Sequence, residues 1–218
     1  MPPSSMTQAA ALNILKTGAN VFLTGEPGSG KTFVTNAYVR YLKQAGVEVA
    51  VTASTGIAAT HLGGMTIHSW SGIGIKKYLS EWDLDRIATN ERIVKRVERT
   101  KVLMIDEISM LDGATLECVD RVCQAIRRKP EPFGGMQVVF VGDFFQLPPI
   151  AREDEPPPVF AFAGAAWRAT RPMVCYLSEQ YRQEDETFLS ILGALRRNTI
   201  SSDHCAHLEK RRHTNAQT

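Results

Sequence analysis

Short apolar runs alternate along the chain with longer segments in which apolar residues recur every three or four positions. The first pattern is typical of strands buried on both faces, and the second is typical of helices with one buried side. We expect strands at 21–24, 47–52, 102–105, 137–141 and 173–177, and helices near 7–16, 31–45, 55–62, 90–98, 112–128 and 184–197. This alternation predicts an α/β fold with helices on both faces of a parallel sheet.

The same pattern predicts how the chain is divided. Residues 1–171 are expected to form one α/β domain, with a charged, proline-rich and exposed loop over 152–158. Residues 172–200 are expected to be a linker and the first elements of a second domain, for which the chain is too short. Residues 201–218 are polar and basic, and we expect a disordered tail there.

Composition places the chain among ordinary soluble globular proteins. Its 218 residues are 44% hydrophobic and 22% charged, which is enough to bury the core of one α/β domain. A net charge of +2 neither demands nor excludes a polyanionic partner, so any nucleic-acid surface must be local. No apolar run approaches the roughly 20 residues of a membrane-spanning helix, and residues 1–5 do not resemble a signal peptide. We therefore expect an intracellular protein without a membrane partner.

Residues 25–32 read Gly-Glu-Pro-Gly-Ser-Gly-Lys-Thr, a complete G-x-x-x-x-G-K-[ST] phosphate-binding loop between a predicted strand and a predicted helix. Its glycines let successive N–H groups turn toward one oxyanion, and the helix N-terminus adds partial positive charge. Lys31 is expected to reach the β- and γ-phosphates, and Thr32 to hold Mg²⁺. The alternative is a glycine-rich turn before an ordinary helix. The residues assigned to the nucleotide are Gly25, Pro27, Gly28, Ser29, Gly30, Lys31, Thr32 and Phe33.

Two carboxylates, Asp106 and Glu107, directly follow the apolar run at 102–105. Ligands bind outside the carboxyl ends of parallel strands, so the pair should face the phosphate-binding loop. We expect Asp106 to hold Mg²⁺ and Glu107 to polarise the attacking water. The alternative is a solvated acidic turn. Neither D-x-x-G at this strand nor N-K-x-D occurs, which argues against a signalling GTPase.

Gln146 follows another apolar strand, in the stretch Gly-Asp-Phe-Phe-Gln-Leu-Pro-Pro at 142–149. The two prolines stiffen the turn and would hold Gln146 where it can sense the γ-phosphate or orient water. On its own, this glutamine reads equally as part of a surface turn.

Several further segments carry ordered motifs. They are Thr-Ala-Ser-Thr-Gly-Ile-Ala-Ala at 52–59, Thr-Ile-His-Ser-Trp-Ser-Gly-Ile-Gly at 66–74, Pro-Phe-Gly-Gly-Met-Gln at 132–137 and Leu-Ser-Glu-Gln-Tyr-Arg-Gln at 177–183. Together with the segments 25–32, 105–110 and 142–149, they resemble the motifs of superfamily-one DNA helicases. Within that class they are most similar to the petite-integration-frequency (Pif) family, with RecD-type enzymes as close relatives. The resemblance covers residues 7 to 198.

The resemblance implies a RecA-like P-loop NTPase domain, the N-terminal motor domain of an ATP-dependent DNA helicase that moves 5′ to 3′ on single-stranded DNA. It implies fork and duplex DNA as further partners, and roles in DNA repair, recombination and telomere maintenance. It also implies that Gln8 hydrogen-bonds the adenine edge and that Arg182 reaches the γ-phosphate. The residues it assigns to DNA are Ser54, Thr55, Gly56, Thr66, His68, Ser69 and Trp70. Trp70 reads equally as a core residue, and the basic helix 90–98 reads as a solvated face.

The family also needs a second motor domain, and no segment after Arg182 resembles its motifs. We therefore expect a monomer that binds ATP or ADP with Mg²⁺, hydrolyses ATP slowly and does not unwind duplex DNA alone. The compartment would be the cytoplasm of a prokaryote, or the nucleus or mitochondrion of a eukaryote. Two other functions stay open, namely a nucleotide-dependent DNA-binding module without motor activity and a small-molecule kinase.

Overall fold

A six-stranded parallel sheet forms the centre of the fold, with the strand order β3-β2-β4-β5-β1-β6. The computed structural model describes residues 6–61, 63–150, 157–178 and 186–210. The strands are β1 (Val21–Gly25), β2 (Val49–Ala53), β3 (Met65–Thr66), β4 (Val102–Asp106), β5 (Gln137–Val141) and β6 (Met173–Leu177). All five predicted strands are confirmed, and the added strand, β3, is too short to leave a readable pattern.

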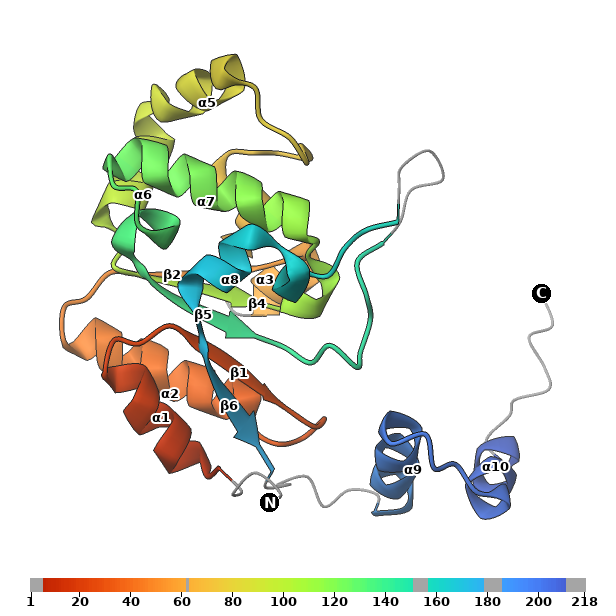
Figure 1. The fold of residues 1–218 in the computed structure, drawn as a ribbon. Helices are drawn as coiled ribbons and strands as arrows, with labels where there is room; N and C mark the ends of the chain where they lie inside the picture. Colours follow the sequence, from red (N-terminus) through yellow and green to blue (C-terminus); the bar gives the residue numbers. More distant parts are fainter. Residues whose placement is uncertain (1–5, 62, 151–156, 179–185, 211–218) are drawn as a thin grey trace. The chain divides into compact units, whose positions relative to one another are not determined.

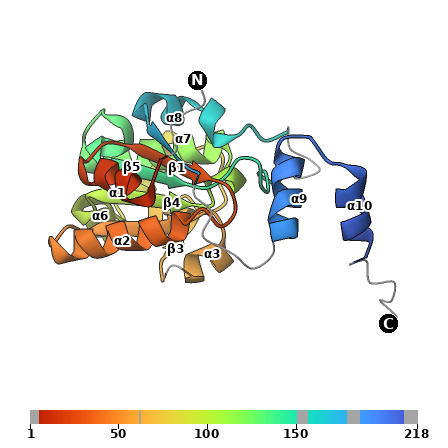
Figure 2. The ribbon, with the colours of Figure 1, turned by 90° about the horizontal axis from the view of Figure 1, so that it is seen from below.

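Helices cover both faces of the sheet, as the sequence predicts. Figure 1 shows α1 and α2 on one side and α7 and α8 on the other, and Figure 2 shows α2 and α8 on opposite sides of the strands. The helices are α1 (Gln8–Lys16), α2 (Lys31–Gln44), α3 (Gly56–His61), α4 (Ile67–Ser71), α5 (Glu81–Ala88), α6 (Glu91–Arg99), α7 (Gly113–Arg127), α8 (Ala165–Thr170), α9 (Glu186–Arg196) and α10 (Ser202–Glu209). The described residues also form the short 3₁₀ helices η1 (Ile108–Met110), η2 (Pro132–Gly135) and η3 (Ala161–Ala163).

Successive residues of each central strand belong to different cores. In β4, Met104 packs with residues of α1 and α2, whereas Leu103 and Ile105 pack with residues of α4 to α8. Side chains alternate between the two faces of a strand, so a continuous apolar run is what a sheet covered on both sides requires. Burying each such side chain contributes about 1.5–3 kcal/mol, which fixes the strands and therefore the position of the segments that follow them.

The sequence pattern misses four helices, α4, α5, α8 and α10, none of which is longer than eight residues. So few residues define no clear apolar face, and local capping marks where α4, α5 and α10 begin. Thr66 caps α4, and Ser80 caps α5 in a reciprocal pair with Asp83. The helix signal therefore lies in the caps rather than in the apolar periodicity.

Two of the predicted boundaries need correction. The chain divides into one compact unit over Met1–Glu179 and another over Gln180–Thr218, so the first unit continues past residue 171. The reason is β6, which pairs with β1 from Met173 to Leu177 and belongs to the sheet. The predicted disordered tail, 201–218, begins with the helix α10, which Ser201 and His204 cap reciprocally. None of the helices within the described ranges is long and apolar enough to cross a membrane.

Candidate functional site

The phosphate-binding loop joins β1 to α2 through glycines that adopt positive φ angles. Gly28 has a φ of 82° and Gly30 a φ of 89°, in the left-handed region that favours glycine. A Cβ atom on Gly30 would also collide with the side-chain amide of Gln8. Gly30 is the N-cap of α2, and no side chain caps this helix. A helix start without a side-chain cap is a suitable place for an anion.

Polar groups line this turn. The Lys31 ammonium group donates hydrogen bonds to the carbonyl oxygens of Gly25, at 2.7 Å, and Glu26, at 3.2 Å. The Ser29 hydroxyl is buried, and no group in the described part of the chain hydrogen-bonds it. A lysine ammonium beside an unsatisfied hydroxyl and an uncapped helix start is a suitable lining for phosphate oxygens.

Asp106 occupies the carboxyl end of β4, two strands from the loop in the sheet order β4-β5-β1. Burial raises the pKa of Asp106 to about 6, and a 2.8 Å hydrogen bond from the Glu107 N–H opposes this shift. The positive charge of Lys31 also lowers the pKa of Asp106. The charge of Lys31 therefore acts on Asp106, although burial has the larger effect on this carboxyl group.

Asp106 is expected to make the stability of the ligand-free chain depend on pH. The pKa of Asp106 is about 6 in the folded chain and 3.8 for an unperturbed aspartate side chain, so the folded state binds more protons between these values. The contribution of Asp106 to stability therefore falls as the pH rises through 6. We expect Asp106→Asn to raise the free energy of unfolding by up to about 3 kcal/mol at pH 7.5, and by less as the pH falls toward 4.

Urea denaturation in Mg²⁺-free buffer at several pH values measures this difference between Asp106→Asn and the wild type. The exposed Asp85, changed to asparagine, controls for the loss of a carboxylate elsewhere on the surface. Parallel pH profiles for the wild type and Asp106→Asn would contradict the prediction.

Glu107 has an unusual backbone conformation, with φ 52° and ψ 42° in the left-handed region. Its carbonyl oxygen accepts a 2.9 Å hydrogen bond from the Ser54 hydroxyl and a 3.0 Å bond from the Met110 N–H. The Ser54 N–H donates to the Asp106 carbonyl oxygen at 3.1 Å. The Ser54 hydroxyl is therefore directed to the backbone beside the carboxylates, and the role of Ser54 in DNA contact stays a prediction.

Gln146 lies in the exposed turn after β5 and is tied to a buried carboxylate. The Gln146 N–H donates to the Asp143 carbonyl oxygen at 2.9 Å, and its side-chain amide lies 3.5 Å from the Asp143 carboxylate. Phe144 anchors the turn, with its ring 5.3 Å from that of Phe22 and 5.8 Å from that of Trp167. Aromatic packing therefore holds this turn in addition to the predicted prolines, and no sequence pattern indicated those partners.

The other polar groups predicted to bind DNA lie on two neighbouring segments. Thr55 directly precedes α3, which begins at Gly56, while Thr66 caps α4 and accepts a 3.2 Å hydrogen bond from the Ser69 N–H. β2 pairs with β3, so both segments follow adjacent strands at the same edge of the sheet. His68 is partly buried, and burial lowers its pKa while the carboxylate of Asp112 opposes the shift.

Trp70 lies in the core. Its side chain is 2% exposed and belongs to the apolar cluster that contains Ile67 and Ile73. A base can stack only on an accessible aromatic face, so the prediction that Trp70 contacts DNA is corrected. The helical spacing of α4 explains the outcome, because Ile67 and Trp70 are three residues apart and lie on the same buried side.

Arg96 supports the segment predicted to contact DNA, a role that sequence reasoning missed. Its guanidinium donates to the Ser69 carbonyl oxygen at 3.0 Å and lies 3.4 Å from the Met65 sulfur. Desolvation by burial lowers the pKa of Arg96. The basic helix 90–98 was expected to be a solvated face, and nothing in its charge pattern singles out Arg96.

The remaining predicted residues are placed as follows. The side-chain amide of Gln8 donates to the Ser29 carbonyl oxygen at 3.3 Å, which puts Gln8 against the phosphate-binding loop. Thr32 and Phe33 are exposed in the first turn of α2. Arg182 lies outside the described residues.

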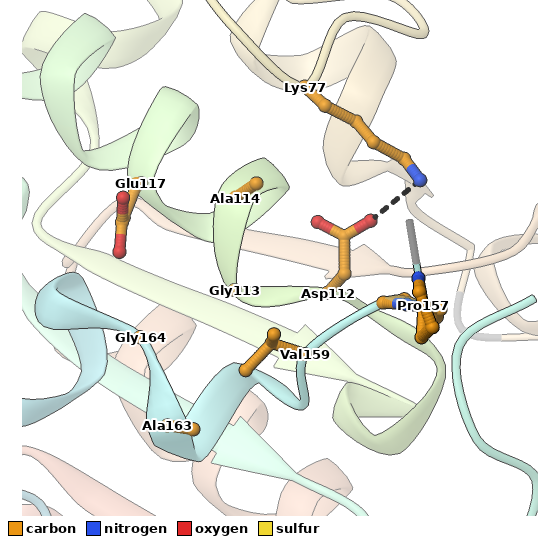
Figure 3. A pocket seen from close by; sticks show the side chains of 10 residues that line it. Lys77, Asp112, Gly113, Ala114, Glu117, Pro157, Val159, Ala163 and Gly164 are labelled. Carbon is orange, nitrogen blue, oxygen red and sulfur yellow. Dashed lines mark ion pairs between the residues drawn. The ribbon is translucent and has the colours of Figure 1, made fainter. Parts of the chain in front are cut away.

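A separate hollow of about 570 Å³ opens beside the start of α7. Figure 3 shows Lys77 and Asp112 pointing toward one another there, with a 3.4 Å ion pair, while Val159 and Ala163 line the other side. No residue of the phosphate-binding loop, and neither Asp106 nor Glu107, lines this hollow. It is therefore distinct from the candidate site.

Residues 5–199 match the family model described as PIF1-like helicase. The chain is 54% identical over 180 residues to the "ATP-dependent DNA helicase Pif1" of Psychrobacter sp., covering 82% of this chain and 27% of that protein. It is 40% identical over 203 residues to the "ATP-dependent DNA helicase RRM3" of Saccharomyces cerevisiae, covering 91% and 28%.

Solved structures of Pif1 helicases are also similar to this chain. The crystal structure of Pif1 helicase from Candida albicans matches with a TM-score of 0.85 and 36% identity, over 95% of this chain and 47% of that one. That of Pif1 helicase from Bacteroides "in complex with ADP-AlF3 and ssDNA" matches with a TM-score of 0.80 and 29% identity, over 97% and 50%. The chain thus spans 27–28% of the curated relatives and about half of these solved chains. The predicted RecA-like fold is confirmed, and the chain belongs to the PIF1-like helicase family.

Proposed function

We propose that this chain is the ATP-binding motor domain of an ATP-dependent DNA helicase. The observation that carries the proposal is geometric: the phosphate-binding loop with Lys31 follows β1, and Asp106 ends β4, at the same carboxyl edge of one parallel sheet. Family membership supports it, as does the relative from Bacteroides that was solved with ADP-AlF3 and single-stranded DNA.

The residues present fit a nucleotide with Mg²⁺. The glycine turn and Lys31 would hold the phosphates, and Thr32 and Asp106 would hold the metal ion. Mg²⁺ is usually bound through one or two carboxylates together with substrate phosphates, so a single buried carboxylate beside the loop suits it. Once bound, Mg²⁺ would neutralise charge that develops on the transferred phosphoryl group.

The other polar residues of the site would act on the nucleotide. Glu107 would polarise the attacking water and accept its proton, and Gln146 would orient that water or sense the γ-phosphate. Arg182 would reach the γ-phosphate, an interaction worth 10³–10⁵ in rate in related systems. Gln8 would hydrogen-bond the adenine edge, and Phe33 would lie against the nucleotide.

Single-stranded DNA would cross the edge formed by the segments after β2 and β3. Thr55, Gly56, Thr66 and Ser69 offer hydroxyls and backbone N–H groups there for the phosphate backbone, with His68 beside them. Phosphate contacts of this kind are independent of sequence, which suits a protein that moves along DNA. We propose movement from 5′ to 3′, with fork and duplex DNA as further partners.

We also propose that the chain works as a monomer beside a second motor domain, because the solved relatives are about twice as long as the part they share with it. Closure of two domains over ATP would pull the DNA between them. The compartment would be the cytoplasm of a prokaryote, or the nucleus or mitochondrion of a eukaryote.

Ligand binding by the purified chain tests the proposed function. Mg²⁺·ADP at 100-fold over its dissociation constant should stabilise the chain by about 2.7 kcal/mol, measured as a rise in melting temperature. A fluorescent oligothymidine should bind with an affinity that falls as salt rises. We expect slow ATP hydrolysis and no separation of a forked duplex by this chain alone. The proposal is wrong if neither ligand binds, and robust unwinding would refute the need for a second domain.

A further inference from the structure

One hydroxyl connects the segment predicted to contact DNA with the predicted catalytic carboxylates. Ser54 lies between the end of β2 at Ala53 and the start of α3 at Gly56. Its N–H donates to the Asp106 carbonyl oxygen at 3.1 Å, and its hydroxyl donates to the Glu107 carbonyl oxygen at 2.9 Å. A single residue therefore binds the backbone of both carboxylate residues.

The neighbouring hydroxyls make only local bonds among those described for this segment. The Thr55 hydroxyl accepts from the Ala58 N–H, and the Thr60 hydroxyl donates to the Gly56 carbonyl oxygen at 2.9 Å. Both contacts stay within the first turns of α3. The Ser54 hydroxyl, in contrast, crosses to the segment that follows a different strand, so its bond is specific to the junction between the two sites.

The peptide groups on both sides of Glu107 are held by hydrogen bonds. Its N–H donates to the Asp106 carboxylate at 2.8 Å, and its carbonyl oxygen accepts from Ser54 and from Met110. The left-handed conformation costs a residue with a Cβ about 1–2 kcal/mol, so the surrounding bonds must maintain it. The right-handed region is the nearby alternative, and the two conformations would aim the Glu107 side chain differently.

We propose that Ser54 is a positioning residue that couples the DNA segment at Thr55 and Gly56 to the catalytic geometry of Glu107. DNA that binds this segment shifts the loop carrying Ser54, and the hydroxyl transmits the shift to the Glu107 backbone. The left-handed conformation seen at Glu107 would be one of the two discrete states that such coupling requires, and relaxation to the right-handed region would give the other. The inference rests on the proposed function, because it takes single-stranded DNA and Mg²⁺·nucleotide as the two ligands.

Thermodynamic reciprocity makes the coupling measurable by binding alone. The factor by which DNA changes nucleotide affinity must equal the factor by which nucleotide changes DNA affinity, and such factors are typically about 5–150. Titrations of the purified chain with a fluorescent Mg²⁺·ADP analogue, with and without saturating oligothymidine, give this factor. Titrations with labelled oligothymidine, with and without Mg²⁺·ADP, check it independently.

We expect the coupling factor of Ser54→Ala to lie within about twofold of one. Ser54→Thr keeps a hydroxyl and should keep the coupling factor of the wild type. Single-turnover phosphate release should slow about 10-fold in Ser54→Ala, with little change in the affinity for Mg²⁺·ATP. Thr60→Ala removes a hydroxyl from the same segment and should leave the coupling factor unchanged.

An unchanged coupling factor in Ser54→Ala, when the wild type binds both ligands, would overturn the inference and leave the proposed function intact. An equal loss of coupling in Thr60→Ala would also overturn it, because the effect would then belong to α3 in general. A wild-type chain that binds neither ligand would overturn the proposed function and this inference together.

Discussion

Replacing Lys31 with alanine is expected to reduce the rise in melting temperature that Mg²⁺·ADP produces to about half or less. A hydrogen bond to a charged group contributes about 1.5–3 kcal/mol, so nucleotide affinity should fall about 10- to 100-fold. ATP turnover should fall further, by about 10²–10³, because the ammonium group would also stabilise charge that develops during phosphoryl transfer. Thermal denaturation with and without nucleotide, followed by calorimetric titration, measures both the shift and the affinity.

Lys31 also bonds the carbonyl oxygens of Gly25 and Glu26, so its removal affects the loop as well as the ligand. The melting temperature of the ligand-free variant separates the two effects. Lys43→Ala, in the last turn of the same helix, is the matched control and should keep the full shift. A fully retained shift in Lys31→Ala would show that the nucleotide binds elsewhere.

Trp70→Ala is expected to lower the free energy of unfolding by about 3–5 kcal/mol, a large share of the stability of a domain this size. The indole is 2% exposed and packs in the cluster with Ile67 and Ile73, so its removal leaves a cavity. Urea denaturation followed by circular dichroism measures the loss.

Trp82→Ala is the matched control, because the Trp82 side chain is 67% exposed. Among the aromatic and cation–π contacts described, the Trp82 ring makes one, with the Arg86 guanidinium at 5.0 Å from its centroid. We expect a loss below about 1 kcal/mol there. Full stability combined with lost DNA binding in Trp70→Ala would contradict the structure and restore Trp70 to the DNA path.

Ser29 and Ser54 show which contacts a sequence motif can predict and which it cannot. The loop motif assigned Ser29 to the nucleotide, and the structure places its buried hydroxyl in the turn, with no hydrogen-bond partner among the described residues. A comparable motif assigned Ser54 to DNA, and the structure directs its hydroxyl to Glu107. The motif around Ser29 forms one continuous turn, so its residues are neighbours in the sequence. The motif around Ser54 lies next to the end of β4, a strand that is distant in the sequence, so the residues after β2 do not reveal this contact.

The amino-acid sequence by itself determined the five main strands and the parallel sheet with two covered faces. It also determined that Lys31, Asp106 and Gln146 lie at or beyond the carboxyl ends of three of those strands. These features depend on local periodicity and on the order of strands along the chain, and both can be read from consecutive residues. The tertiary structure alone decided that Trp70 is buried, that Arg96 supports Ser69, and that Ser54 bonds Glu107. Each of these depends on which distant segment lies opposite a side chain, and only the packing of helices and strands in three dimensions sets that.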